Sequence, residues 1–223
     1  MNTIAIITAM DSEFNAILSL YDFKLNNANI METSAHNKTI YLIKSGIGKV
    51  NAALCANFAI QNGADIVLNT GLAGGISDDL NQGDVVLADK VCYHDVWCGE
   101  PNLKGQVQEM PLFYKIEENL LLKLQNVAKD NGYKIGLAVT GDQFLTDVNR
   151  LMQIKKDFPE AVAVDMESAA IAQTCYVNNK PFLSLRIISD VVGKTNQVEQ
   201  YNAFWQNMPQ MASIMVDRII ESL

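Results

Sequence analysis

Basic residues are scarce in this chain of 223 residues, and arginine is the scarcest. The sequence has 17 Lys and Arg, of which only Arg150, Arg186 and Arg218 are arginine, against 25 Asp and Glu, for a formal net charge of −8. A protein that binds nucleic acid or an anionic membrane surface needs a basic face that neutralises phosphate groups. We therefore expect no nucleic-acid partner and no membrane partner. Few arginine side chains are therefore available to bind the phosphate group of a substrate.

Paired cysteines and long apolar runs are also missing. The four cysteines, Cys55, Cys92, Cys98 and Cys175, form no Cys-x-x-Cys pair, which predicts reduced thiols and a cytoplasmic protein. No apolar run approaches the roughly 20 residues of a membrane span. The first residues are rich in Ile and are followed at once by acidic residues, which indicates a first strand rather than a signal peptide. Apolar residues make up 49% of the sequence, which excludes a disordered chain.

Cofactor motifs are absent as well. Three glycine-containing turns, Gly46–Asn51, Gly71–Gly75 and Gly193–Thr195, lack the spacing with which backbone amides hold a dinucleotide or ATP. The segment Cys92–Cys98 contains a histidine and an aspartate between its cysteines, but the chain has only two histidines and no second cluster of metal ligands. We therefore expect neither a metal nor another cofactor.

What the sequence has is a regular alternation of strands and helices. Strands are predicted at Thr3–Thr8, Thr39–Lys44, Asp65–Asn69, Asp84–Ala88, Ile135–Thr140, Ala161–Asp165 and Phe182–Ile188. Helices are predicted at Asp11–Leu20, Lys49–Gln61, Glu117–Asn131, Asp147–Asp157, Glu167–Val177 and Glu199–Ile220, the last with a kink at Pro209. This alternation favours an α/β fold with a largely parallel central sheet, in a single domain over residues 1–223.

Three carboxyl side chains follow the predicted strands, where ligands of such sheets gather. They are Glu13, Glu167 and Asp190. Each could simply favour or cap the start of a helix or end of a strand. All three are predicted at one edge of one sheet, which favours a shared functional role over three separate structural roles. Carboxyl groups in an apolar site are the groups that cleave a glycosidic bond, since one can protonate the leaving group and another can activate water.

A series of short motifs runs nearly the whole length of the chain. They are Ile7-Thr-Ala-Met-Asp-Ser-Glu13, Lys44-Ser-Gly-Ile-Gly-Lys-Val50, Asn69-Thr-Gly71 with Ala73-Gly-Gly75, Tyr93-His-Asp95, Thr140-Gly-Asp-Gln-Phe144, Val164-Asp-Met-Glu-Ser168 and Arg186-Ile-Ile-Ser-Asp190. Each motif is weak alone, but the set in this order resembles the 5′-methylthioadenosine/S-adenosylhomocysteine nucleosidase family of the nucleoside phosphorylase-like superfamily. The resemblance implies a three-layer αβα sandwich with a mixed, largely parallel central sheet.

The resemblance also implies an activity and catalytic roles. The expected reaction is hydrolysis of an N-ribosyl bond that releases adenine, in methionine salvage. Glu13 would direct or deprotonate the attacking water, and Asp190, positioned by Ser189, would protonate adenine at N7. Glu167 and the backbone of Met166 would hold the ribose hydroxyl groups.

The remaining expectations concern 5′-substituted adenine nucleosides as ligands. Phe144 would stack on the purine and Leu145 would read its edge through backbone groups. Met10 and Ile47 would line the ribose and alkylthio region, and either Tyr201 or Phe204 would close the site. Relatives are homodimers in which the partner chain completes the alkylthio pocket, so a homodimer is expected.

Two segments depart from the family pattern, and other functions stay open. Leu72 stands where the family often has Ser, and the segment 97–111 matches poorly. The alternatives are an aminodeoxyfutalosine nucleosidase, a purine nucleoside phosphorylase and a non-catalytic nucleoside-binding protein of the same fold. The scarcity of arginine argues against the phosphorylase, and the retention of three carboxylates argues against a non-catalytic protein.

Overall fold

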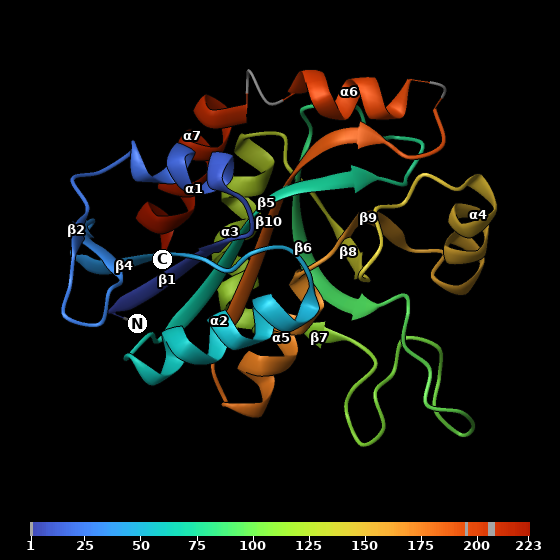
Figure 1. The fold of residues 1–223 in the computed structure, drawn as a ribbon, viewed down its shortest axis with the longest axis horizontal. Helices are drawn as coiled ribbons and strands as arrows, with labels where there is room; N and C mark the ends of the chain where they lie inside the picture. The colour runs from blue at the N-terminus through green and yellow to red at the C-terminus, as the bar shows by residue number, and fades with distance from the viewer. Residues whose placement is uncertain (1, 195, 205–207) are drawn as a thin grey trace.

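The computed structural model describes residues 2–194, 196–204 and 208–223 (Figure 1). Its strands join into one sheet of mixed direction. Strand β1 (Thr3–Thr8) lies between β4 (Lys38–Lys44) and β5 (Ile66–Gly75), and these strands run parallel. Strand β10 (Phe182–Val191) continues the parallel arrangement on β5. Nearly every residue of β1, β5 and β10 is buried, as expected for parallel strands covered on both faces.

The other end of the sheet closes on itself. Strand β10 also pairs antiparallel with β6 (Val85–Tyr93), which is followed by β8 (Lys134–Thr140) and β9 (Ala161–Asp165). Strand β9 then pairs with the end of β5. Five strands therefore form a closed ring, in which the end of β5 pairs with both β9 and β10. The α/β fold with a mixed sheet is confirmed, with this curvature in addition.

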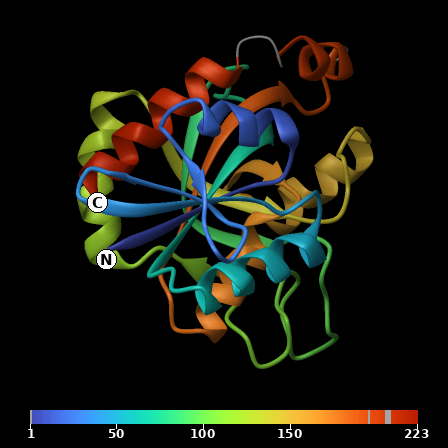
Figure 2. The same cartoon turned by 60° about the vertical axis from the view of Figure 1, so that its left-hand side comes forward.

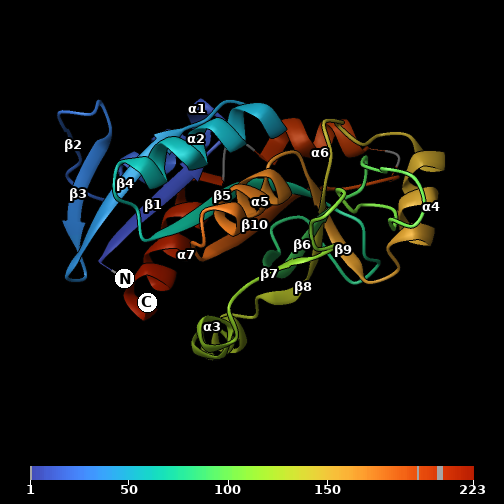
Figure 3. The ribbon, with the colours of Figure 1, turned by 90° about the horizontal axis from the view of Figure 1, so that it is seen from below.

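The helices cover both faces of the sheet because the strand side chains alternate between them. On β1, Ile4 and Ile6 point into one apolar core, whereas Ile7 points into another. Helices α1 (Asp11–Leu18), α3 (Glu118–Asp130) and α7 (Met208–Ser222) pack on the first core. Helices α2 (Lys49–Gln61) and α5 (Ser168–Val177) pack side by side on the second, as Figure 3 shows. Figure 2 shows both helical layers around the sheet.

Helix α4 (Val148–Asp157) begins beside the ring of strands, and Asp147 caps it by accepting a hydrogen bond from the backbone N–H of Asn149 at 2.9 Å. The sequence predicts that this helix begins at Asp147, and the capping role of Asp147 explains the one-residue difference. Within the described parts of the chain, no helix combines the length and apolar character needed to cross a lipid bilayer.

The prediction of one long C-terminal helix was wrong. The segment forms α6 (Gln197–Phe204) and α7, and the connection between them lies outside the described residues. Pro209 is the second residue of α7. The first turn of a helix tolerates proline, because its backbone N–H groups need no partner within the helix. The predicted mid-helix kink therefore does not occur.

Three short strands were not predicted. They are β2 (Lys24–Leu25), β3 (Met31–Ala35) and β7 (Tyr114–Lys115). Strands β2 and β3 extend the sheet beyond β4, and none of their residues is fully buried. An edge strand with little buried surface shows no apolar alternation, so the periodicity could not reveal it.

Candidate active site

A pocket lies at the carboxyl ends of β1, β9 and β10 and along the end of β5. All ten residues that the sequence predicted for the site line the pocket. They are Met10, Glu13, Ile47, Phe144, Leu145, Met166, Glu167, Ser189, Asp190 and Tyr201. Phe204, the alternative to Tyr201, lies in the apolar core instead.

Glu13 is a carboxyl group of the pocket that the backbone holds in place. It lies in the first turn of α1 and is 2% exposed. Its Oε2 accepts hydrogen bonds from the backbone N–H groups of Ala9 at 2.8 Å and Met10 at 3.0 Å, and its Oε1 accepts from that of Leu72 at 2.9 Å. Three donors on two oxygens are the arrangement of an ionised carboxylate. Glu13 is therefore held in one orientation by the backbone of α1 and β5.

Gly71 leaves the space that Glu13 occupies. A Cβ atom at residue 71 would lie 2.4 Å from Glu13 Oε1 and 2.9 Å from Arg186 Nη1. Real Cβ atoms do not approach other atoms so closely, so any larger residue at this position would displace one of the two side chains. Gly71 is thus needed because the Glu13 and Arg186 side chains lie so close to its backbone, and not because the chain makes a tight turn there.

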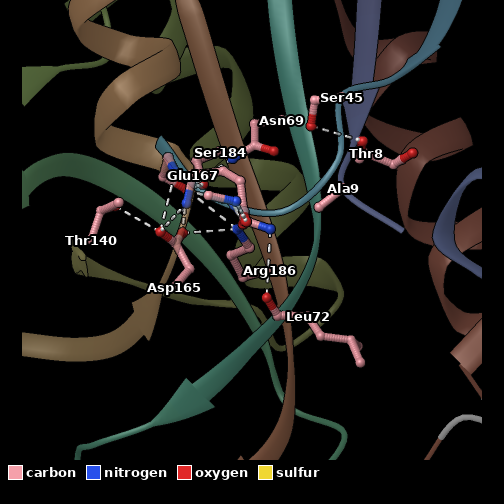
Figure 4. Close-up of polar contacts among 12 residues, drawn as sticks. Thr8, Ala9, Ser45, Asn69, Leu72, Thr140, Asp165, Glu167, Ser184 and Arg186 are labelled. Atoms are coloured by element: carbon pink, nitrogen blue, oxygen red, sulfur yellow. Dashed lines mark hydrogen bonds and ion pairs between the residues drawn. The ribbon is translucent and has the colours of Figure 1, made fainter. Parts of the chain in front are cut away.

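Arg186 lies beneath the pocket, in the middle of β10, and is 1% exposed. Its Nε donates to Asp165 Oδ2 at 2.9 Å, and its Nη2 donates to Ser168 Oγ at 3.1 Å and lies 3.5 Å from Glu167 Oε2 (Figure 4). Its Nη1 lies 3.5 Å from the carbonyl oxygen of Leu72. The guanidinium group thereby interacts with carboxylate, hydroxyl and backbone carbonyl groups of the protein itself.

Asp165 organises the start of α5 around this cation. Its Oδ1 accepts from Thr140 Oγ1 at 2.6 Å and from the backbone N–H of Ser168 at 3.1 Å. A buried ion pair is tolerated only when further hydrogen bonds satisfy its remaining groups. Asp165 and Arg186 meet that condition, so they form a rigid base for the adjacent Glu167.

Glu167 is the residue immediately before α5 and is 6% exposed. Its Oε1 accepts from the backbone N–H of Gly48 at 3.0 Å, which ties the Gly46–Gly48 turn to the pocket. Burial raises the pKa of Glu167 to about 7, although the nearby Arg186 opposes that rise. Burial also raises the pKa of Glu13, again against Arg186 and the three backbone donors. A raised pKa makes each of these groups a better proton acceptor near neutral pH.

Asp190 has different neighbours. It is 2% exposed, its Oδ1 accepts from Ser189 Oγ at 2.5 Å, and its Oδ2 accepts from Gln197 Nε2 at 2.8 Å. Burial raises the pKa of Asp190, and these two neutral donors only partly oppose the rise. A buried carboxyl group without an adjacent cation is suited to hold a proton and release it to a base.

Apolar side chains complete the pocket wall. The rings of Phe144 and Tyr201 lie with centroids 5.2 Å apart, and the Tyr201 hydroxyl contacts the Met10 sulfur at 3.9 Å. Phe144 and Ile47 are each 51% exposed, whereas Leu145 is buried. Exposed aromatic and aliphatic side chains at a pocket mouth offer a surface for a flat or apolar group of a ligand.

A polar clamp, Lys49–Asp95–Asp142, joins two loops of the pocket. Asp142 Oδ1 accepts from the backbone N–H of Lys49 at 2.8 Å, at the start of α2. Asp95 Oδ2 accepts from Lys49 Nζ at 2.7 Å and from the backbone N–H of Asp142 at 3.0 Å. The clamp therefore fixes the turn that carries Ile47 relative to the loop that carries Phe144.

Cationic side chains are missing from the wall of the pocket. Among the lining residues within the described ranges there are four carboxyl groups and no Lys or Arg. No three His, Cys, Asp or Glu side chains of these ranges are grouped so that they could hold a metal ion. The arrangement can move protons to and from a ligand and can stabilise a developing positive charge. Within the described ranges, the lining residues offer no cationic side chain to a phosphate group.

Sequence reasoning gave no role to Arg186, Asp165 or Gln197. Arg186 did carry a signal, because a charged residue in the centre of the apolar strand 182–188 must be paired in the fold. Gln197 carried none, since its contacts depend on how α6 folds back over β10.

The chain is similar to known proteins in both sequence and fold. The family model of the Phosphorylase superfamily matches residues 3–221. A 5′-methylthioadenosine/S-adenosylhomocysteine nucleosidase of Staphylococcus aureus (strain bovine RF122 / ET3-1) is 34% identical over 228 residues, which cover 99% of this chain and 100% of the relative.

Solved structures of similar proteins share the fold of this chain. The 5′-methylthioadenosine/S-adenosylhomocysteine nucleosidase of Neisseria meningitidis, in complex with methylthio-immucillin-A, superposes with a TM-score of 0.92 at 33% identity and full coverage of both chains. A futalosine hydrolase mutant of Helicobacter pylori strain 26695 superposes with a TM-score of 0.91 at 28% identity, also over both full chains.

Proposed function

Since the chain belongs to the phosphorylase superfamily, and to the 5′-methylthioadenosine/S-adenosylhomocysteine nucleosidases within it, we propose that it hydrolyses the N-glycosidic bond of these 5′-substituted adenine nucleosides. The observation that carries the proposal is one pocket in which Glu13 and Asp190 are both buried yet have different neighbours. The products are adenine and the 5′-substituted ribose.

The two carboxyl groups have complementary roles in this proposal. Glu13, held as a carboxylate by three backbone N–H groups, orients the attacking water and accepts its proton. Asp190 donates a proton to adenine N7, so that the base leaves as a neutral molecule. The ribosyl centre becomes positively charged as the bond breaks, and the carboxylates of the pocket stabilise that charge.

The other lining residues bind the substrate. Glu167 and the Met166 backbone hold the ribose hydroxyl groups, and Phe144 stacks on the purine. Leu145 reads the purine edge through its backbone. Ser189 positions Asp190, in keeping with its hydrogen bond to Oδ1. Met10 and Ile47 line the ribose and the 5′ substituent, and Tyr201 closes the site.

Water, rather than phosphate, is the proposed nucleophile. Arg186, which lies beside the pocket, is buried and hydrogen-bonded to Asp165 and Ser168. The test is product analysis with and without inorganic phosphate. We expect free 5-methylthioribose and the same rate in both cases. Formation of 5-methylthioribose 1-phosphate, only when phosphate is present, would identify a phosphorylase instead.

The preference among adenine nucleosides is a separate question, because a futalosine hydrolase is also a structural neighbour. We propose methylthioadenosine and adenosylhomocysteine as substrates on the higher identity to their nucleosidases. The kcat/KM for these two, measured beside aminodeoxyfutalosine, tests this. A higher value for aminodeoxyfutalosine would reassign the substrate while leaving the reaction unchanged.

We also propose that the protein is a cytoplasmic homodimer. A groove between α2 and α5 is lined by Val50, Leu54 and Val177, which are 71%, 66% and 58% exposed. The irregular segment that follows β6 adds Trp97 and Leu103, which are 62% and 59% exposed. Apolar surface of this kind marks an interface. Ile47 precedes α2 and lines the pocket, so a second copy seated on this face would lie next to the pocket mouth.

Light scattering coupled to gel filtration tests the dimer. We expect twice the chain mass of 24.6 kDa at micromolar concentration. Leu54→Glu should produce a monomer with lower activity, whereas Leu122→Glu, at an exposed leucine on α3, should stay dimeric. A fully active monomer of the unmodified protein would disprove the proposal.

A further inference from the structure

Gln197 is a buried residue whose contacts converge on the base-binding part of the pocket. It is the first residue of α6 and is 5% exposed. Its Nε2 donates to Asp190 Oδ2 at 2.8 Å and to the carbonyl oxygen of Leu145 at 2.8 Å. Its Oε1 accepts from the backbone N–H of Gly193 at 3.1 Å. Every polar atom of the side chain is thus engaged, and both hydrogens of the amide are assigned.

The chemistry of a primary amide restricts what Asp190 can do. An amide nitrogen donates hydrogen bonds and does not accept them. Asp190 Oδ2 must therefore be an acceptor as long as Gln197 contacts it, so a proton on this carboxyl group belongs on Oδ1. Ser189 Oγ lies 2.5 Å from Oδ1 and 3.3 Å from the carbonyl oxygen of Ala73. Its hydroxyl hydrogen can turn to Ala73 when Oδ1 carries the proton, because a hydroxyl group both donates and accepts.

We propose that Gln197 is a positioning residue of the reaction, which orients Asp190, reserves Oδ2 as an acceptor and so assigns the transferable proton to Oδ1. The same amide holds Asp190 and the Leu145 carbonyl at fixed positions relative to each other. Helix α6, which also carries Tyr201, thereby completes the part of the pocket that binds and protonates the base. This inference rests on the proposed function of Asp190 as the general acid.

A consequence for pH dependence follows from the direction of this hydrogen bond. A donor to a carboxylate stabilises its ionised form, so the bond from Gln197 lowers the pKa of Asp190 against the raising effect of burial. The other titratable groups that line the pocket within the described ranges are Tyr201 on α6, Glu13 on α1, Asp165 at the end of β9 and Glu167 before α5. A general acid must be protonated, so kcat/KM should fall at high pH as Asp190 ionises. Without the amide, that fall should move to higher pH.

The test is the pH profile of kcat/KM for Gln197→Met, which has nearly the same shape but no donor. We expect the high-pH limb to move upward by about one pH unit, because a hydrogen bond to a charged group is worth at least that much. We expect kcat at neutral pH to fall about tenfold or more, since the carboxyl group loses its fixed orientation. Gln197→Glu, which adds a like charge beside Asp190, should move the limb in the same direction.

Gln200→Met is the matched control. Gln200 is a partly buried residue of the same helix, and its side chain contacts Asn196 and the backbone of Val191 rather than Asp190. This variant should keep the limb of the unmodified enzyme. If Gln197→Met and Gln197→Glu both leave the limb in place, the inference is wrong, even if they lower stability.

A second measurement separates this inference from the proposed function. Asp190→Asn should abolish the high-pH limb; if that variant retains it, Asp190 is not the acid and the proposed function fails. The ¹³Cγ chemical shift of Asp190, titrated in aspartate-labelled protein, reports its ionisation without catalysis. An Asp190 titration that is unchanged in Gln197→Met would overturn the positioning role alone.

Discussion

Glu13 and Asp190 are both buried carboxyl groups of one pocket, yet they are surrounded by different kinds of neighbour. Glu13 lies beside Arg186 and accepts hydrogen bonds from three backbone N–H groups. Asp190 accepts one hydroxyl and one amide donor. Burial raises the pKa of both groups, but a cation opposes the rise only at Glu13. The neighbours, rather than the residue type, therefore distinguish the two carboxyl groups, in keeping with the proposed roles of Glu13 as a base and Asp190 as an acid.

The comparison also shows where the fold supplies rigidity. The backbone of β5 and the start of α1 fix Glu13, and Gly71 leaves the space that it needs. Asp190 depends on side chains, one from its own strand and one from α6. We expect the surroundings of Glu13 to tolerate fewer substitutions than those of Asp190, because backbone positions cannot adjust independently.

The largest expected effect comes from removing either proton-transfer group. Asp190→Asn keeps the shape but cannot transfer a proton, and Glu13→Gln cannot accept one from water. General acid–base catalysis contributes about 10²–10⁴-fold, so kcat should fall by this factor in each variant. Binding of adenine, measured by calorimetry, should survive in both. If Asp190 were only a structural residue, Asp190→Asn would instead lower the melting temperature and leave kcat per folded molecule nearly unchanged.

Much of this site could be predicted from the sequence because strand ends are marked by periodicity. The positions of Glu13, Glu167 and Asp190 after apolar runs were enough to place them at one edge of the sheet, and the structure brings them into one pocket. The family resemblance added the aromatic and aliphatic residues of the wall. The catalytic roles themselves stay predictions until the variants are measured.

The features that were missed depend on contacts between distant segments. Gln197 reaches Leu145 across 52 residues of sequence, and Arg186 reaches Leu72 across 114. Local periodicity carries no information about such pairs. The division between α6 and α7 was missed for a related reason. The apolar spacing continues through both helices, and Pro209 was assigned to the interior of one helix rather than the start of the second.

The next effect concerns the cation that distinguishes the two carboxyl groups. Arg186→Met leaves Asp165 and Glu167 buried without their partner, which should cost about 3–5 kcal/mol of unfolding free energy. Urea denaturation measures this loss. The double variant Arg186→Met/Asp165→Asn should recover part of it, because the uncompensated charge is removed. Equal stability of the single variant and the unmodified protein would show that the pair contributes nothing.

A smaller effect is expected in the pH dependence of stability. Burial raises the pKa of Glu167 in the folded protein to about 7, above the ordinary value of 4.5. The folded state therefore holds a proton that the unfolded chain releases, and the stability from this group is complete below pH 4.5 and is lost as the pH rises through 7. The Tm should fall between pH 5 and pH 7.5. Glu167→Gln should reduce that slope, whereas Glu118→Gln, at an exposed position of α3, should not.

The smallest expected effect is at the polar clamp, which joins two loops without touching either proton-transfer group. Asp142→Ala removes the acceptor for the Lys49 backbone N–H at the start of α2. Loss of such a cap costs about 1 kcal/mol. If the lost hydrogen bond mainly disturbs the alignment of the Ile47 turn with the Phe144 loop, substrate binding should weaken. KM should then rise about fivefold while kcat stays within about twofold.

Asp147→Ala is the matched control for Asp142→Ala, because Asp147 also accepts a backbone N–H at the start of a helix, α4, but does not line the pocket. It should cost similar stability and leave KM unchanged. An equal rise of KM in both variants would show that the clamp acts only through stability, and a fall in kcat confined to Asp142→Ala would show that it also aligns the catalytic carboxyl groups.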